Sequence, residues 1–241
     1  MITANVTFKQ WVKTSSHPLA RNLCRNFKRL RSFEIPAPKY ICTLFYQAHR
    51  SASALCSTGA RILWWTPLFK SRCQHVGKGL FLYGGLPYLA GPLSISIGEQ
   101  CRISGRTTLS GRSTARTRPQ LSIGNNVDLG WQTTVAVGTR IELGDNVRIA
   151  GQCFLAGYPG HPVNAQKRAA GEPESDHQAR DIVLERDVWL GTGVTVLAGV
   201  RIGRGTIVSA GSLVCKNLPA GVIAAGNPAR VVKTLGAEAG L

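Results

Sequence analysis

Residues 184–219 repeat with a period of six, and this repeat restricts the fold more than any other feature of the chain. The first residue of every hexad is aliphatic and the fifth is small or aliphatic, in the consecutive blocks LERDVW, LGTGVT, VLAGVR, IGRGTI, VSAGSL and VCKNLP. A period of six differs from the turn of a helix and from the alternation of a simple strand. It is typical of a parallel β-helix, in which three short sides make a coil of about 18 residues. Coils stack at about 4.8 Å. We therefore predict an all-β parallel β-helix.

Earlier hexads extend this coil toward the N-terminus, with three interruptions. The hexads become regular at Ile97, and we place the coil domain at residues 76–241. A basic insertion interrupts them at 115–122, and Ile141 and Glu142 shift the register by two residues. The longest break is a loop excursion at 157–182. Position four of many hexads is Gly, Asn or Asp, where we expect corners with positive φ. Long excursions from a rigid scaffold usually carry function.

Residues 1–75 form a basic extension of a different kind. They hold twelve Lys or Arg and one acid, Glu34, in a chain whose formal net charge is +17. We expect a short helix at 19–31 and a second helix from Tyr40 onward. An apolar cluster with two tryptophans follows at 62–69. It suits a membrane interface, or it covers the open end of the coil, and one segment can do both. A solvated basic arm is the third interpretation.

The cysteines and the hydropathy indicate the compartment. The seven cysteines contain no CxxC pair, which favours a reducing environment and argues against a zinc site. Cys101 and Cys153 occupy fifth positions of hexads, so we predict that they are small inward-facing fillers. There is no run of 18 apolar residues, and we expect neither a membrane-spanning helix nor a secretory signal. We expect a cytoplasmic protein held peripherally at the inner face of the membrane.

Four motifs of the coil region resemble one family as a set. They are GHP at 160–162, RAAGEP at 168–173, DVWLG at 187–191 and GNPARVV at 226–232. Together they resemble the sugar O-acetyltransferases of the hexapeptide family, which include galactoside, maltose and nodulation-factor acetyltransferases. The basic extension is similar to that of surface-polysaccharide acyltransferases. The resemblance covers about residues 95–235. It implies a left-handed β-helix, a homotrimer, and acetyl-CoA bound in clefts between subunits.

The same resemblance assigns a general base. An acetyl thioester is already activated, so its transfer needs a base for the acceptor hydroxyl and a donor for the tetrahedral oxyanion. His161 of the GHP motif matches the base of the relatives, and an imidazole has a suitable pKa range for this role. We interpret His177, the other histidine of the excursion, as a surface residue.

Cofactor contacts carry over by position along the last hexads. The resemblance implies that Trp189 walls the active-site cleft, with Gly191 of the same motif also at the cofactor. It further implies that Thr192 and Ala210 meet the pantetheine arm through backbone groups. The remaining matches are Cys215 and Lys216 near the nucleotide, and Arg230 and Lys233 at the CoA phosphates.

The acceptor side departs from the family pattern. Galactoside acetyltransferases present an Asn and an Asp to the sugar, where this chain has Gly130 and Gly138. We therefore expect an acceptor other than a simple galactoside or maltose. Asp128, Trp131 and Gln132 are nearby and are our candidates for holding a sugar ring.

Two other functions were weighed against acetyl transfer. Zinc carbonic anhydrases of this fold need three His ligands, whereas the coil region offers only the two histidines of one loop. A non-enzymatic scaffold would not need the GHP loop. We expect no metal, and no nucleic-acid partner, because the basic residues accompany an apolar cluster rather than a nucleic-acid motif. The sequence thus predicts an acetyl-CoA-dependent O-acetyltransferase acting on a sugar, glycolipid or polysaccharide precursor. The extension would bind an anionic membrane surface.

Overall fold

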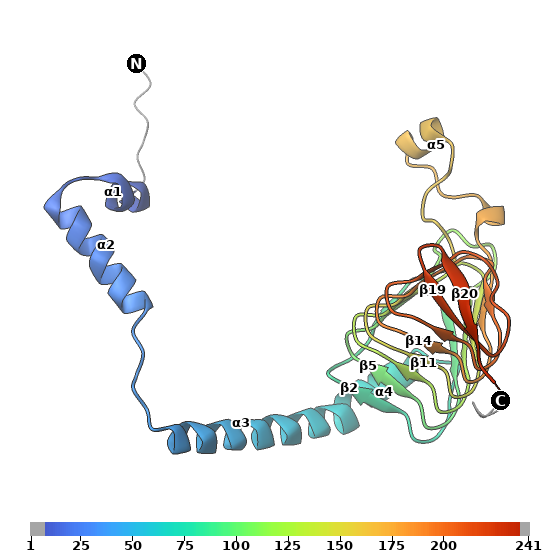
Figure 1. Cartoon of the computed structure of the whole chain (residues 1–241), viewed down its shortest axis with the longest axis horizontal. Coiled ribbons are helices and arrows are strands. Elements are labelled where there is room, and N and C mark those ends of the chain that lie inside the picture. Colours follow the sequence, from blue (N-terminus) through green and yellow to red (C-terminus); the bar gives the residue numbers. More distant parts are fainter. Residues whose placement is uncertain (1–7, 237–241) are drawn as a thin grey trace. The chain divides into compact units, whose positions relative to one another are not determined.

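The hexads fold into a parallel β-helix with three sheets, which successive strands visit in turn (Figure 1). The computed structural model describes residues 8–236 of the chain. Sheet A contains β1 (His75–Val76), β4 (Ser94–Ile97), β7 (Gln120–Ile123), β10 (Arg140–Leu143), β13 (Ile182–Leu184) and β16 (Arg201–Ile202). Sheet B contains β2 (Phe81–Tyr83), β5 (Arg102–Ser104), β8 (Asp128–Leu129), β11 (Arg148–Ile149), β14 (Trp189–Leu190), β17 (Ile207–Val208), β19 (Val222–Gly226) and β20 (Ala229–Thr234). Sheet C contains β3 (Tyr88–Ala90), β6 (Thr108–Gly111), β9 (Thr134–Val137), β12 (Phe154–Ala156), β15 (Thr195–Leu197) and β18 (Leu213–Val214).

The core of the coil is built from the repeated positions that the sequence predicted. First and fifth positions of hexads 184–219 are all buried, with at most 7% of any residue exposed. Cys101 and Cys153 are buried fillers as predicted, and their thiols donate to the carbonyls of Gly124 (3.1 Å) and Gly191 (3.2 Å). Burial raises the pKa of both thiols, which makes them poor nucleophiles.

The corners have the backbone conformation that position four requires. Asp187 opens the series with a φ of +65°, and the glycines four places into the following hexads are also positive. Glutamine takes the same conformation at three earlier corners, Gln100, Gln132 and Gln152, which the sequence pattern did not predict. Non-glycine residues occupy this region at some cost, so neighbouring coils must fix the turn.

All three interruptions leave the coil at one corner, between sheets C and A. In a regular turn Leu184 pairs with Ile202, 18 residues on, whereas Ile95 pairs with Leu121, 26 residues on. The two later coils are longer by two residues and by 23, since Leu121 pairs with Ile141 and Ile141 with Ile182. The additions are the loop 112–119, the turn 138–139 and the excursion 157–181. The prediction of an insertion at 115–122 was wrong at its end, because Gln120–Ser122 belong to β7.

A helical segment closes the first end of the coil. It comprises a π-helix at Arg61–Trp65 and α4 at Thr66–Ser71. Phe69 is completely buried within the coil core, and Trp65 packs partly against it. The Arg61 guanidinium lies 4.9 Å from the centre of the Phe81 ring. The opposite face of this segment exposes the apolar side chains of Ile62, Leu63, Trp64 and Leu68. The segment therefore covers the coil and keeps an exposed apolar face.

Residues 1–53 form a separate unit by their contacts, and residues 54–241 form the other. The first unit holds α1 (Phe8–Thr14), α2 (Pro18–Arg31) and the beginning of α3 (Lys39–Ala60). The predicted helices at 19–31 and from Tyr40 are present, whereas α1 was not predicted. Residues 54–75 group with the coil by contact, so the functional boundary at residue 75 stays a prediction. Within residues 8–236, no helix combines the length and apolarity that crossing a bilayer requires.

Candidate active site

Three of the predicted site residues lie in one row across the outer face of sheet B. Asp128 pairs with Arg148, Arg148 with Trp189, and the row continues through Ile207 and Ile223 to Lys233. Strands are about 4.8 Å apart, so Trp189 is about 10 Å from Asp128 along the row. The Trp189 side chain points outward and is half exposed. The row places an aromatic wall between an acidic group and a basic group.

A second line of predicted residues forms the corner between sheets B and C. Backbone bonds stack this corner from coil to coil: the Trp131 carbonyl accepts from Gln152 (2.8 Å), and the Thr192 carbonyl accepts from Gly211 (2.8 Å). Ala210 occupies the equivalent place one coil later and is exposed, as is Thr192. This B–C corner therefore presents a column of small residues and backbone groups beside Trp189.

Glycines of this corner allow two close approaches. A Cβ on Gly151 would lie 2.6 Å from Nε1 of Trp131, so the indole lies over that glycine. A Cβ on Gly191 would lie 2.7 Å from the Ala210 nitrogen. Coil stacking therefore requires a glycine at 191 by itself, without a cofactor.

The candidate acceptor residues are held by neighbours of unequal strength. Asp128 is 3.7 Å from the Arg102 guanidinium in a partly exposed ion pair. Gln132 accepts from the Gln152 side-chain amide (3.2 Å), and Trp131 remains about half exposed. All of them are on the outside of sheet B or at the B–C corner.

The other predicted cofactor residues are on the surface near the last coil. Cys215 and Lys216 follow β18 and are exposed. Arg230 and Lys233 lie on β20, which pairs antiparallel with β19 at the end of sheet B, and are also exposed. Three cationic side chains are thus available to an anion, two of them on the sheet that carries Trp189.

His161 lies on the excursion, at the C–A corner. Its side chain is exposed. The following turn is organised by Arg168, whose Nη1 donates to the carbonyls of Pro162 and Val163, both at 3.0 Å. Asn164 caps α5 (Ala165–Ala169) by accepting from two backbone amides. These contacts fix the backbone around His161 from within the excursion.

The base of the excursion is clamped to the loop 112–119. Arg112 is almost fully buried and pairs with the buried carboxylate of Glu174. It also bonds Asp176 (2.8 Å), which Arg116 contacts from outside (2.9 Å). Thr114 donates to the same Glu174 oxygen (3.0 Å). Burial alone would raise the pKa of Glu174, but the bonds from Arg112 and Thr114 hold it below its ordinary value. The clamp therefore keeps an ionised pair inside the protein.

Arg112, Glu174 and Arg168 are the positioning residues that sequence reasoning missed. A signal was available, because each interruption follows the third hexad of a coil and therefore leaves at the same corner. Loops that leave one corner of successive coils must be neighbours, which would have placed the basic insertion beside the acidic part of the excursion. His177 is exposed on a short 3₁₀ helix at Asp176–Gln178, and the structure gives it no contact that argues for a catalytic role.

Comparison with known proteins identifies the repeat. The family profile described as bacterial transferase hexapeptide (six repeats) matches residues 181–216. The chain carries the hexapeptide repeat of the bacterial transferases. It is 36% identical to galactoside O-acetyltransferase of Escherichia coli K12 over 115 residues, which is 48% of this chain and 54% of the relative. The Lactococcus lactis enzyme of that name is 36% identical over 110 residues, 46% of this chain and 48% of its own length. This hexapeptide-repeat chain thus spans about half the length of the curated relatives it matches.

A solved structure supports the fold of the hexapeptide repeat. It is an N-acyltransferase from Bacillus cereus in complex with coenzyme A and dTDP-4-amino-4,6-dideoxyglucose. The TM-score is 0.58 with 24% identity, over 71% of this chain and 89% of that one. The coil is accordingly a left-handed parallel β-helix, as the sequence resemblance implied.

Proposed function

We propose that the chain is an acetyl-CoA-dependent O-acetyltransferase whose acceptor is a hydroxyl of a sugar, glycolipid or polysaccharide precursor. The observation that carries this proposal is the exposed His161 on an excursion that two separate sets of contacts hold in place. Similarity to two galactoside O-acetyltransferases supports both the acetyl donor and an oxygen acceptor.

The chemistry needs only groups that this surface offers. His161 takes the proton of the acceptor hydroxyl, and the oxygen attacks the thioester carbonyl. The tetrahedral oxyanion collapses, the C–S bond breaks, and the CoA thiolate recovers the proton from the imidazolium. Trp189 walls the cleft, while Lys216, Arg230 and Lys233 offer cations to the CoA phosphates. The acceptor would lie near Asp128, Trp131 and Gln132.

The test is acetyl transfer by the purified chain to a panel of hydroxyl and amino sugars and to lipid-linked glycans. CoA should be measured by chromatography, because exposed cysteines such as Cys42, Cys56 and Cys215 would react with thiol reagents. The proposal requires CoA release together with an acetyl ester on a hydroxyl acceptor. Products only on amino sugars would make the chain an N-acetyltransferase, like the Staphylococcus aureus relative that is 45% identical over 62 residues, 26% of this chain and 25% of that protein. Acetyl-CoA left unchanged by every acceptor would favour a non-enzymatic scaffold.

We further propose that the active protein is a homotrimer. The strands of sheet C contain no charged residue, whereas sheets A and B each contain several. Outward residues such as Tyr88 and Phe154 are exposed on sheet C. His161 belongs to one corner flanking this sheet, and the cofactor residues belong to the other. If sheet C faces a threefold axis, the two corners of neighbouring copies meet, and each site is complete.

The trimer is tested by placing charge on sheet C. Phe154→Asp should dissociate the assembly and abolish transfer, because a buried unpaired carboxylate is costly at an interface. Leu197→Ala removes exposed apolar surface without adding charge and should leave the trimer largely intact. Light scattering gives the mass and chromatography gives the activity. A monomer with full activity would rule out a site shared between copies.

We place the protein at the cytoplasmic face of a membrane, bound to anionic lipid through residues 1–75. The support is the cationic composition of this region together with the exposed Trp64 and Leu68 of the capping segment. A membrane position would bring the acyltransferase to lipid-linked acceptors.

A further inference from the structure

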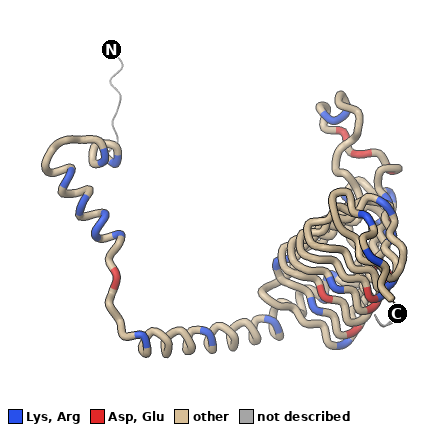
Figure 2. Tube along the Cα trace, viewed as in Figure 1, with Lys and Arg blue, Asp and Glu red and all other residues tan. Residues whose placement is uncertain are grey.

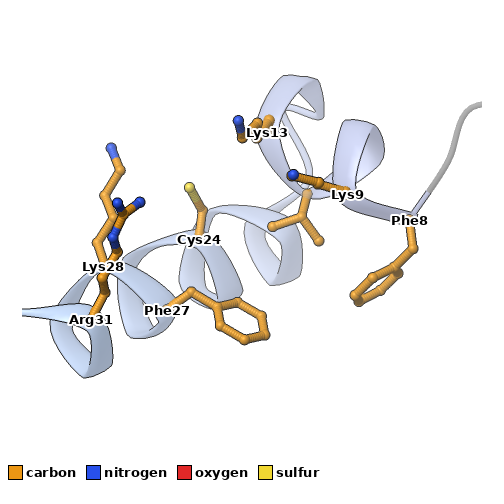
Figure 3. A pocket seen from close by; sticks show the side chains of 8 residues that line it. Phe8, Lys9, Lys13, Cys24, Phe27, Lys28 and Arg31 are labelled. Carbon is orange, nitrogen blue, oxygen red and sulfur yellow. The ribbon is translucent and has the colours of Figure 1, made fainter. Parts of the chain in front are cut away.

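The helices α1 and α2 enclose a cleft of about 520 Å³ (Figure 3). Val12 and Ala20 are buried in this unit. His17 fixes the start of α2 by accepting the Leu19 amide (3.2 Å). Phe8 and Phe27 extend toward one side of the cleft and remain more than half exposed. The cleft therefore has apolar walls that no residue of the described chain covers within this unit.

The rim of the cleft is cationic. Lys9, Lys13, Lys28 and Arg31 line it, and their side chains come from both helices (Figure 3). Residues 8–33 contain seven Lys or Arg and no Asp or Glu, so no internal acid neutralises the rim (Figure 2). An apolar pocket bordered by uncompensated cations is complementary to a molecule with an anionic head and an apolar tail.

We propose that the α1–α2 cleft is a binding site for one anionic phospholipid of the membrane surface. The phosphate lies among the four rim cations, and the first part of an acyl chain lies along Phe8, Val12 and Phe27. The inference rests on the proposed membrane association and deepens it, since it assigns that association to a defined site.

A nucleic acid fits this cleft less well. Phosphodiester binding needs cations along a surface and, for single strands, aromatic faces on which bases stack. Here Phe8 and Phe27 border an apolar cavity whose floor is aliphatic and thiol in character, from Val12 and Cys24. That environment suits methylene groups.

The experiment measures binding of the full chain to vesicles of phosphatidylglycerol or of phosphatidylcholine at 0.15 M salt. The rim variant Lys9→Gln/Arg31→Gln is compared with the control Arg29→Gln/Lys39→Gln, which loses the same charge outside the cleft. Two lost headgroup contacts should weaken binding to phosphatidylglycerol about 30-fold in the rim variant. The control should lose less than about threefold.

A second pair of variants tests the tail. Phe27→Ser removes an exposed wall of the cleft, and Leu30→Ser removes a more exposed apolar residue outside it. Only the first should weaken binding by about tenfold. Alkylation of Cys24, followed by mass spectrometry, should slow when phosphatidylglycerol vesicles are present.

The outcomes separate the two proposals. Equal weakening in rim and control variants would mean diffuse electrostatic attraction, so the site would be refuted while the membrane proposal stood. No binding of the full chain to either vesicle would refute both. Retention of duplex DNA in place of vesicles would do the same. Acetyl transfer to a soluble acceptor should be equal in all four variants.

Discussion

His161→Ala should lower the rate of acetyl transfer by about 10²–10⁴ while the fold stays intact. The loss has this size because a positioned general base contributes about that factor to a proton transfer. The residue is exposed and no core contact depends on it, so thermal unfolding should be unchanged. The measurement is CoA release under saturating acetyl-CoA, with thermal denaturation of the same samples.

His177→Ala is the matched control, because it removes an exposed histidine from the same excursion. It should change the rate by less than about threefold. Similar losses in the two variants would show that the excursion, and not one imidazole, is required. A pH–rate profile adds a second criterion: the limb due to the base should vanish in His161→Ala and persist in His177→Ala.

Arg112→Met should release the excursion from the coil. The change leaves the Glu174 carboxylate buried without its partner, and removing one member of a buried ion pair costs about 3–5 kcal/mol. Because the pair joins two loops and lies outside the hexad core, we expect local opening of residues 157–181. Amide protection at Ala179 and Arg180 should fall by about 10²-fold or more in hydrogen exchange. Acetyl transfer should fall with it, because Arg112 positions the loop that bears His161.

Arg116→Gln is the control for this change, since Arg116 is highly exposed and contacts Asp176 from the solvent side. Exposed pairs contribute about 0–1 kcal/mol, so protection should change little. The clamp also predicts acid sensitivity. The folded pKa of Glu174 lies below its ordinary value of 4.5, so the stabilisation is complete above about pH 4.5 and is lost as the pH falls through the folded pKa. Unaltered protection in Arg112→Met would show that other contacts hold the excursion.

The coil could be predicted almost residue by residue, because its pattern is local. Each hexad supplies its own inward residues and its own corner, so the buried set from Leu184 to Leu218 followed directly from counting in sixes. The same counting failed at β7, where a strand begins on Gln120 without a hexad signal. Pairing with β4 and β10 fixes that strand, and such pairing is a property of neighbouring coils.

The candidate site could be predicted only in part. A motif located His161, but no local pattern shows which distant residue supports it. The partnership of Arg112 with Glu174 joins residues 62 positions apart and depends on two loops that leave the same corner. Helix α1 was missed for a similar reason, since its seven residues are too few for a clear period.

The shared corner of the three interruptions has a consequence for how such a protein diversifies. Hexads can be conserved as an invariant framework while one edge accepts loops of any length, because chain added there disturbs no pairing between coils. Loop closure penalties grow only slowly with length, so such additions are tolerated thermodynamically. Exchanging the edge loops 112–119 and 157–181 together, as an interlocked cassette, should therefore transplant acceptor preference between coils. Exchanging either loop alone would separate Arg112 from Glu174.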